Sequence, residues 1–262
     1  MKKNGRHGMF YIALFVICFI GGRMVAAKQT AQTGNFSHGA RIAIVIDDFG
    51  YGGEGTMEML ALPIPFTAAV MPFCEGTQED LERVREAGKE IFLHMPMEAL
   101  TGERSWIGEG GIFCEMADDE IRCAVEHALH AVPDAVGMNN HMGSAVMENT
   151  EILQSVMKVA AENDLIFLDS KTTANSCGEV LAKEYGVVYL SRDVFLDGTN
   201  HVEAVKGNLR RTAETALTKG SAIAIGHVGP EGGLVTARAL AEMIPELEAM
   251  GITFVTAGEI GI

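Results

Sequence analysis

Cationic side chains are scarce in this chain, and their scarcity argues against several kinds of partner. The 262 residues include 20 Lys and Arg against 35 Asp and Glu, a formal net charge of −15. This balance argues against a nucleic-acid partner, because phosphate contacts need Lys and Arg. It also argues against binding of the folded domain to an anionic membrane surface. The acidity fits a soluble domain that binds a cation or a neutral or basic substrate.

Cysteine is scarce as well. The chain has five cysteines and no Cys-x-x-Cys spacing, which argues against a cysteine-rich zinc site. Cys18 lies in an N-terminal apolar segment, and Cys74, Cys114, Cys123 and Cys177 are too few for a disulfide scaffold in a domain of this size. We predict ordinary packing of these thiols and assign no disulfide bridge. The sequence also lacks a glycine-rich dinucleotide fingerprint and a phosphate loop.

The first residues have the pattern of an export signal. Basic residues precede an apolar run at 9–20, and small residues follow at 25–27. The run is too short for a standard transmembrane helix. We predict that residues 1–27 are a signal peptide or, if uncleaved, a short membrane anchor at 9–22, followed by a flexible leader at 28–39. The rest of the chain is then exported (periplasmic, in the cell envelope or secreted), and only the N-terminal segment contacts a membrane.

Strand and helix patterns alternate from residue 41 onward. Apolar, often β-branched runs predict strands at 41–46, 66–70, 90–93, 135–139, 165–168, 187–190, 222–226 and 252–255. Helical patterns lie between most of them, at 77–88, 118–131, 150–163, 178–185, 202–218 and 234–249. This alternation is typical of a parallel sheet built from βα units. About eight units in one uninterrupted domain at 40–262 predict a small, irregular (β/α) barrel, with a doubly wound open sheet as the alternative.

The first predicted strand ends in two adjacent carboxylates, Asp47 and Asp48, followed by a glycine-rich turn. Two like charges side by side repel, so the pair needs a cation or one shared proton. The alternative is that one aspartate caps a short helix near 54–60 and the other is solvated.

Polar residues also follow the other predicted strands. They are His94, the run Asn139-Asn140-His141, the pair Asp169-Ser170, the pair Arg192-Asp193, and His227. In βα barrels the carboxyl ends of the strands converge on one face, which carries the chemistry. Asp48, His94 and His141 would supply one oxygen and two nitrogen ligands to a Zn²⁺-like ion and leave a position open for water. Singly, each histidine could instead be an ordinary core residue.

One long irregular segment, residues 95–116, interrupts the alternation and holds the only tryptophan, Trp106. A loop of this length is usually functional or mobile. Trp106 could stack on a sugar face, but we expect it to anchor the loop to the barrel.

These motifs resemble those of the divergent polysaccharide deacetylases, relatives of the NodB-type carbohydrate esterases. The matching strings are Ile46-Asp47-Asp48-Phe49-Gly50, Leu93-His94-Met95-Pro96-Met97-Glu98, Gly137-Met138-Asn139-Asn140-His141-Met142-Gly143-Ser144, Phe167-Leu168-Asp169-Ser170-Lys171-Thr172, Arg192-Asp193-Val194-Phe195-Leu196-Asp197 and Ala224-Ile225-Gly226-His227. The resemblance implies an irregular (β/α) barrel of about seven to eight parallel strands.

The resemblance also implies roles for the first motifs. Asp47 is similar to the base of the NodB-type enzymes, and Asp48 and His94 are similar to two of their metal ligands. Those enzymes take a further ligand from the second histidine of a His-x-x-x-His motif, where this chain has Glu98. The third ligand is then Glu98 or His141, and we expect His141.

The motifs in the last third of the chain resemble those of the NodB-type enzymes only in part. His227 resembles the histidine that protonates the leaving amine, and Asp193 is expected to orient it. The Arg-x-Pro-Tyr and Asp-x-x-Asp-Trp motifs of the NodB-type enzymes are missing. The residues that we predict to bind substrate are Asn140, Asp169, Ser170 and Arg192.

The resemblance implies a metal-dependent hydrolase, with Zn²⁺ as the expected metal. Its expected substrate is an acetylated glycan of the cell envelope or the extracellular space, from which it removes N-acetyl or O-acetyl groups. One alternative is a non-catalytic envelope protein that keeps the barrel and the metal and binds a glycan. Another is a metal-dependent hydrolase that acts on groups other than acetyl.

Overall fold

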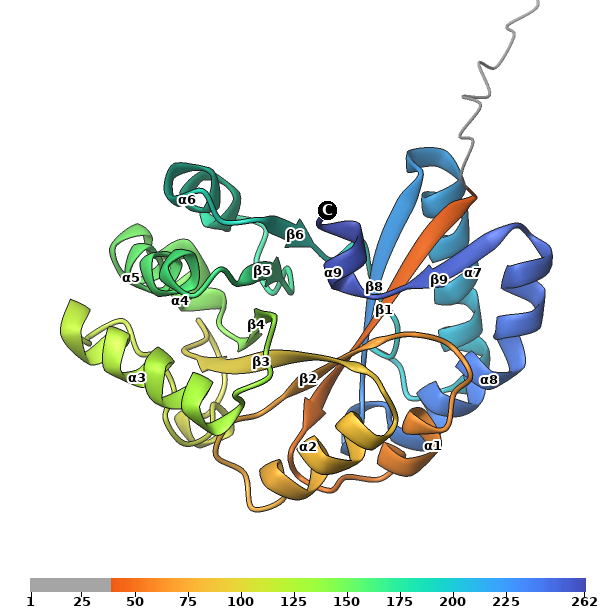
Figure 1. Cartoon of the computed structure of the whole chain (residues 1–262), viewed down its shortest axis with the longest axis horizontal. Coiled ribbons are helices and arrows are strands. Elements are labelled where there is room, and N and C mark those ends of the chain that lie inside the picture. The colour runs from red at the N-terminus through yellow and green to blue at the C-terminus, as the bar shows by residue number, and fades with distance from the viewer. Residues whose placement is uncertain (1–38) are drawn as a thin grey trace, which may run out of the picture. The chain divides into compact units, whose positions relative to one another are not determined.

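The computed structural model describes residues 39–262, and within them nine parallel strands form one sheet (Figure 1). The strands are β1 (Ala40–Phe49), β2 (Thr67–Val70), β3 (Glu90–Met97), β4 (Gly137–Met142), β5 (Ile166–Asp169), β6 (Tyr189–Ser191), β7 (Val194–Phe195), β8 (Ser221–His227) and β9 (Ile252–Val255). The predicted signal peptide or anchor, and the predicted leader up to residue 38, lie outside the described residues. No helix among residues 39–262 has both the length and the apolarity that crossing a membrane requires.

The sheet curls into an irregular barrel. Its strand order is β6-β5-β4-β3-β2-β1-β8-β7, and β9 pairs with the beginning of β1. The two end strands, β6 and β7, are separated in sequence only by Arg192 and Asp193, so the sheet must bend round to bring its ends together. This architecture confirms the predicted (β/α) barrel and excludes the open, doubly wound sheet.

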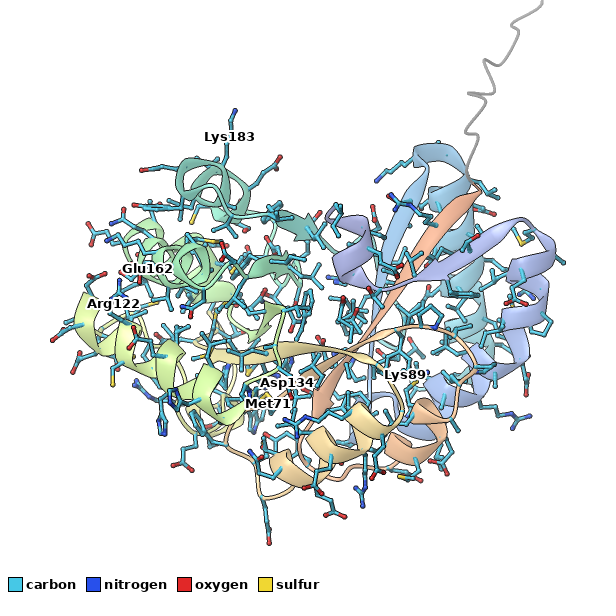
Figure 2. All side chains as sticks on the ribbon, in the orientation of Figure 1. Met71, Lys89, Arg122, Asp134, Glu162 and Lys183 are labelled. Carbon is cyan, nitrogen blue, oxygen red and sulfur yellow. The ribbon has the colours of Figure 1, made fainter. Side chains whose placement is uncertain are left out.

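The helices lie on the outside of the curl, except for the last one, which follows the last strand (Figure 1). They are α1 (Thr56–Leu60), α2 (Thr77–Glu86), α3 (Asp118–Ala131), α4 (Ser144–Glu148), α5 (Thr150–Glu162), α6 (Gly178–Tyr185), α7 (Val202–Lys219), α8 (Gly233–Ala249) and α9 (Ala257–Ile260), with short 3-10 turns η1 (Arg104–Trp106) and η2 (Gly229–Glu231). Charged side chains cover their outward faces (Figure 2). Arg122 of α3, for example, pairs with Glu162 of α5.

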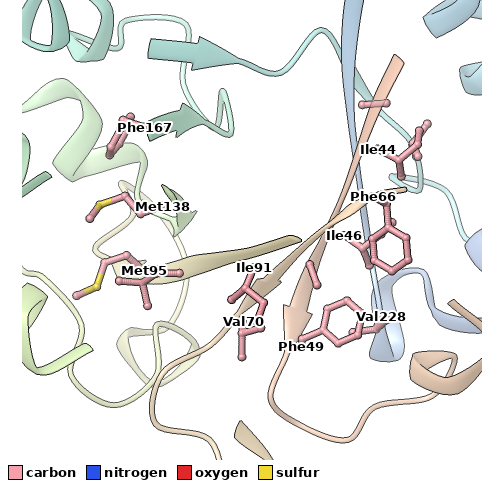
Figure 3. Packing of buried hydrophobic residues seen from close by; sticks show 14 of the residues in the cluster. Ile44, Ile46, Phe49, Phe66, Val70, Ile91, Met95, Met138, Phe167 and Val228 are labelled. Atoms are coloured by element: carbon pink, nitrogen blue, oxygen red, sulfur yellow. The ribbon is translucent and has the colours of Figure 1, made fainter. Parts of the chain in front are cut away.

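The alternation of side chains along β1 divides the core into two layers. Ile42, Ile44 and Ile46 belong to the large cluster between sheet and helices (Figure 3). Ala43 and Val45 belong to a smaller cluster inside the curl. Neighbouring side chains of a strand point to opposite faces, so a strand that is apolar on both faces belongs in a covered parallel sheet.

Helix α9 closes the amino-terminal end of the barrel. Ala257 is part of the inner cluster, and the Glu90 carboxylate accepts hydrogen bonds from Thr67 Oγ1, Thr256 Oγ1 and the Gly258 N–H at 2.8, 2.9 and 3.0 Å. With this end closed, the inside of the barrel is reached from the carboxyl ends of the strands.

Candidate active site

A pocket of about 420 Å³ opens at the carboxyl ends of the strands. Eight of the ten predicted site residues line it, namely Asp47, Asp48, His94, Asn140, His141, Ser170, Arg192 and His227. They come from both halves of the sequence, and the parallel sheet brings them together because its strands all end at one edge.

The end of β1 is built so that both aspartates face the pocket. Neighbouring residues of a regular strand point to opposite sides, but Asp48 has a positive φ of 68°, and the pairing with β2 shifts register between Ile46 and Phe49. Aspartate tolerates this left-handed conformation better than most residues. The buried carboxylate of Asp80 holds the following turn by accepting the N–H groups of Gly50 and Gly52 at 2.7 and 3.1 Å.

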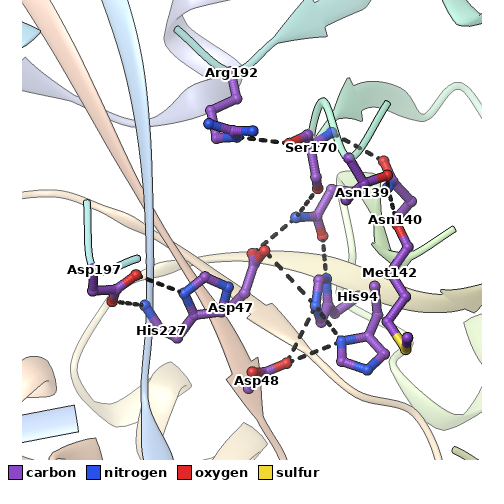
Figure 4. A network of polar contacts seen from close by, with 12 residues as sticks. Asp47, Asp48, His94, Asn139, Asn140, Met142, Ser170, Arg192, Asp197 and His227 are labelled. Atoms are coloured by element: carbon purple, nitrogen blue, oxygen red, sulfur yellow. Dashed lines mark hydrogen bonds and ion pairs between the residues drawn. The ribbon is translucent and has the colours of Figure 1, made fainter. Parts of the chain in front are cut away.

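Three side-chain atoms converge beside this turn (Figure 4). Asp48 Oδ1 lies 3.3 Å from His94 Nε2 and 3.2 Å from His141 Nδ1. The two ring nitrogens are 3.1 Å apart. The outer nitrogen of each ring faces an oxygen, because His94 Nδ1 is 2.8 Å from Asn139 Oδ1 and His141 Nε2 is 3.2 Å from the Trp106 carbonyl. A carbonyl only accepts hydrogen bonds, so the outer nitrogen of each ring carries hydrogen, and in the neutral form of each ring the inner nitrogen presents a lone pair.

Three acceptors at these separations fit a divalent metal ion. Ligand atoms about 2.0–2.2 Å from a tetrahedral zinc lie roughly 3.3–3.5 Å from one another, close to the observed separations. Asp48 Oδ1 is buried and has no hydrogen-bond donor of its own. Burial alone would raise the pKa of Asp48, but contacts with His141 and His94 outweigh it and hold that pKa far below its usual range. Conversely, burial alone would lower the pKa of His94, and the charges of Asp47 and Asp48 raise it. The cluster therefore favours a positive charge, which a metal can supply.

The structure groups His141, not Glu98, with Asp48 and His94. Strand β3 stays extended through Met97, so a residue four positions after His94 lies about 13 Å further along at roughly 3.3 Å per residue. Glu98 instead accepts the N–H of Cys114 at 2.7 Å. The expectation that His141 takes the place of the missing second histidine agrees with this geometry.

Asp47 lies next to the triad and is buried at 2% exposure. Its Oδ1 accepts a hydrogen bond from Asn139 Nδ2 at 2.8 Å, and its Oδ2 is 3.7 Å from His94 Nε2. Burial raises the pKa of Asp47 above its usual value, although His94 and His227 oppose the shift. A carboxylate with a raised pKa accepts protons more readily, which suits a general base.

His227 lies opposite Asp47 across the β1–β8 pairing. Its Nδ1 is 2.9 Å from Asp197 Oδ1, and its backbone N–H donates to Asp197 Oδ2 at 2.7 Å. Thr236 Oγ1 also donates to that oxygen, at 2.8 Å. Burial alone would lower the pKa of His227, but the hydrogen bond to Asp197 and the charge of Asp47 raise it to about 9. The imidazole is therefore protonated at neutral pH and can donate a proton.

The prediction that Asp193 orients His227 is wrong. Asp193 binds Lys219 Nζ at 2.8 Å and accepts the N–H of Ile223 at 3.0 Å. The register of β7 on β8 pairs Phe195 with Ile225, so the position opposite His227 is two residues further on, at Asp197. The residue beside the histidine is therefore Asp197 and not Asp193.

Three of the four predicted substrate-binding residues line the pocket, and the fourth does not. Ser170 and Arg192 line the pocket, and the guanidinium is held by hydrogen bonds from Nε to the Ser170 carbonyl at 2.6 Å and from Nη2 to the Lys171 carbonyl at 2.9 Å. Asn140 also lines the pocket, but its side chain is bonded to the Met142 carbonyl and the Ser170 N–H. Asp169 is fully buried, so the prediction that it binds substrate is wrong.

The carboxylate of Asp169 is instead used within the protein. It accepts hydrogen bonds from Ser176 Oγ at 2.6 Å and Tyr189 Oη at 2.8 Å. Asp169 therefore stabilises the loop after β5 through these hydrogen bonds.

The long loop at residues 95–116 contacts the triad through its backbone. The Trp106 carbonyl is the atom that meets His141 Nε2, whereas the Trp106 side chain is 63% exposed. Trp106 therefore contacts the barrel through a hydrogen bond from His141 to its carbonyl and not through a buried indole.

Two site residues were missed in the sequence analysis. Asn139 links Asp47 to His94, and Asp197 supports His227. Both belong to strings that resembled the family. Asp197 follows β7, which is too short to show a strand pattern in the sequence, and nothing in the sequence distinguishes Asn139 from Asn140 before their directions in β4 are known.

Comparison with known proteins identifies relatives over most of the chain. A family model for divergent polysaccharide deacetylases matches residues 44–260. An uncharacterized protein of Haemophilus influenzae is 33% identical over 225 residues, which cover 86% of this chain and 80% of that protein. The uncharacterized protein YibQ of Escherichia coli is 35% identical over 207 residues, which cover 79% of this chain and 63% of YibQ.

Solved structures share the fold at lower identity. The uncharacterized protein ATU2773 of Agrobacterium tumefaciens has a TM-score of 0.79 at 22% identity, with 85% of this chain and 89% of that chain covered. The Bc1960 peptidoglycan N-acetylglucosamine deacetylase has a TM-score of 0.52 at 17% identity, with 84% and 87% covered. BA3943 of Bacillus anthracis, described as a CE4 family pseudoenzyme, has a TM-score of 0.51 at 12% identity, with 86% and 66% covered.

Proposed function

The chain belongs to the divergent polysaccharide deacetylases, and from this premise we propose that it is a metal-dependent hydrolase that removes acetyl groups from a glycan. The observation that carries the proposal is one pocket that combines the Asp48–His94–His141 triad with a buried carboxylate, Asp47, and a protonated imidazole, His227. Metal-assisted hydrolysis of an amide uses these three elements, namely an electrophilic cation, a base and an acid.

Asp48, His94 and His141 would hold the metal. When bound, a divalent ion supplies Lewis-acid chemistry, in which it polarises the acetyl carbonyl and lowers the pKa of water. We propose Zn²⁺, because one oxygen and two nitrogen ligands with an open position are typical of catalytic zinc. Asp47 then accepts the proton of the attacking water, and Asn139 keeps its carboxylate pointing into the pocket.

His227 donates a proton to the leaving nitrogen, or to the leaving oxygen of an ester. Without that proton the tetrahedral intermediate would have to expel an amide anion, a very poor leaving group. Asp197 stabilises the imidazolium before transfer and fixes the ring. Because Asp47 and His227 are neighbours on β1 and β8 and both line the pocket, the base and the acid can act on one bound acetyl group.

The substrate that we propose is an N-acetylated polysaccharide of the cell envelope or the extracellular space. Ser170 and Arg192 at the pocket wall offer hydrogen-bond donors to its oxygens. The envelope location rests on the export signal predicted for residues 1–27. The Bc1960 relative in fold is named a peptidoglycan N-acetylglucosamine deacetylase, which makes N-acetylglucosamine polymers the first substrates to test.

The test measures metal content and acetate release in the same preparations. We expect about one divalent ion per chain and acetate release from chitooligosaccharides or peptidoglycan. Asp48→Ala should lose both metal and activity, whereas Asp47→Asn should keep the metal and lose turnover by roughly 100-fold or more. Full acetate release by Asp47→Asn, or by metal-free protein, would refute the proposed mechanism.

A second candidate function is glycan binding without catalysis. It is favoured by the departure at Glu98 from the His-x-x-x-His motif and by the fold shared with a protein described as a pseudoenzyme. Tight glycan binding with intact metal and no acetate release across N-acetylated and O-acetylated glycans would decide for it.

A further inference from the structure

We propose that Asn139 is a positioning residue that selects the tautomer of His94 and the direction of Asp47 through one amide group. The proposal rests on the proposed function, because it assigns Asp47 as the base and His94 as a metal ligand. Asn139 does not line the pocket and is fully buried. It therefore acts through the two residues that it binds.

The contacts of Asn139 connect both parts of the site (Figure 4). Its Oδ1 is 2.8 Å from His94 Nδ1, and its Nδ2 is 2.8 Å from Asp47 Oδ1. A longer contact of 3.3 Å joins Nδ2 to Ser170 Oγ. Strand register brings these groups together, since His94 of β3 pairs with Asn139 of β4.

The chemistry of the partners fixes the orientation of this amide. The ionised Asp47 carboxylate only accepts hydrogen bonds, so the NH₂ of Asn139 must face it and the carbonyl must face His94. A carbonyl in turn requires that His94 Nδ1 carry its hydrogen. The lone pair of the neutral ring then lies on Nε2, the nitrogen that faces Asp48 and His141.

Asparagine is suited to this place because it is at once a donor and an acceptor of the right length. An apolar side chain of the same size would provide neither bond and would leave a buried carboxylate oxygen and a buried ring N–H without partners. An aspartate would keep an acceptor for His94. Substitutions can therefore separate the contact with His94 from the contact with Asp47.

The test compares Asn139→Leu and Asn139→Asp, with Asn163→Leu as a control. Asn163 ends α5 and lies outside the pocket. Affinity for Zn²⁺ and the visible spectrum of the Co²⁺-loaded protein need no substrate. We expect Asn139→Leu to bind Zn²⁺ about 10- to 100-fold more weakly and to change the Co²⁺ spectrum. Asn139→Asp should stay within a few-fold of wild type, because its oxygen still accepts from His94.

The link to Asp47 is tested by a double-mutant cycle on acetate release. Asn139→Leu should lower kcat by roughly 100-fold with little change in KM, but in the Asp47→Asn background it should add less than about twofold, because residues that act as a unit are not additive. Circular dichroism of each variant checks that the chain folds.

The outcomes separate the inference from the proposed function. Wild-type Zn²⁺ affinity in Asn139→Leu, or equal weakening in Asn139→Asp and Asn139→Leu, would overturn the link to His94. Full additivity with Asp47→Asn would overturn the link to Asp47. If wild type releases no acetate from any glycan, the proposed function fails while the metal measurements still decide the role of Asn139 at His94.

Discussion

Among single residues, the pair of His227 and Asp197 has the most direct chemical consequence. Both oxygens of Asp197 accept hydrogen bonds from His227 or Thr236. The carboxylate therefore fixes the position of the imidazole and also stabilises its positive charge. We predict that Asp197→Asn lowers kcat by about 100-fold, because the neutral amide no longer stabilises the imidazolium. The measurement is acetate release by protein of verified metal content.

Asp193→Asn is the matched control for this change. It removes the same charge four residues earlier, from a carboxylate that pairs with the exposed Lys219. An ion pair at the surface contributes little, so kcat should stay within about threefold of wild type. Equal losses in the two variants would contradict the assignment of Asp197.

The raised pKa of His227 also predicts how stability depends on pH. The folded protein binds this proton up to a pH of about 9, whereas the unfolded chain releases it near 6.5. The stabilisation is therefore fully present below pH 6.5 and is lost as the pH rises through 9. Its full size is at most roughly 3 kcal/mol.

Urea unfolding of chelator-treated protein at pH 6, 8 and 10 tests this dependence. The difference in unfolding free energy between wild type and His227→Gln should shrink as the pH rises. A difference that is constant across this range would show that His227 does not carry the proton in the folded state.

At the scale of elements, strand β7 explains one error in the predicted site, and the length of β3 explains where Glu98 lies. The two residues of β7 are too few to show a period, and their pairing with β8 is not local, so Asp193 was preferred to Asp197. The apolar run predicts a strand that ends at residue 93, yet β3 continues past Pro96 through Met97, although proline cannot donate to a strand ladder. This extension carries Glu98 away from the triad.

The loops after β1 and β8 form another contact at this scale, and glycine permits it. A Cβ on Gly55 would lie 2.3 Å from the backbone carbonyl carbon of Gly233. We predict that Gly55→Ala destabilises the protein by about 2 kcal/mol more than Gly52→Ala and lowers kcat, because it pushes apart the loops that follow Asp48 and His227.

Gly52→Ala is a close control for this substitution. Both glycines have a positive φ, 86° and 59°, but a Cβ on Gly52 would meet nothing within 4 Å. Gly52→Ala therefore reports the backbone strain alone, about 1 kcal/mol. Equal unfolding free energies of the two variants in urea would contradict the role of the Gly55–Gly233 contact.

At the scale of the whole molecule, the fold and the location of the site follow from the sequence, while the partners within the site do not. Eight strands and six helices were predicted close to their observed bounds, because apolar runs and helical periods are local signals. The parallel arrangement then places every strand end at one edge. Which of two neighbouring polar residues faces the pocket, as for Asn139 and Asn140, depends on register and on local backbone conformation.

Removal of a bound metal should lower the thermal stability of the whole domain. A metal that binds only the folded chain stabilises it by about 4 kcal/mol when present at a thousandfold excess over its Kd. For a domain of this size that corresponds to a rise in Tm of roughly 10 °C. We expect this rise on adding Zn²⁺ to chelator-treated protein, because Asp48 Oδ1 and the two inner ring nitrogens lie at the separations that a bound cation requires.

Two variants decide which residue completes the triad. His141→Ala should abolish the Zn²⁺-dependent rise in Tm, whereas Glu98→Gln should keep it, because Glu98 faces Cys114 and not the metal site. The opposite pattern would make Glu98 the third ligand. Glu98 could reach the site only if β3 ended before Pro96 and folded back, so the same pair of melting curves also tests whether β3 is as long in solution as its pairing with β4 requires.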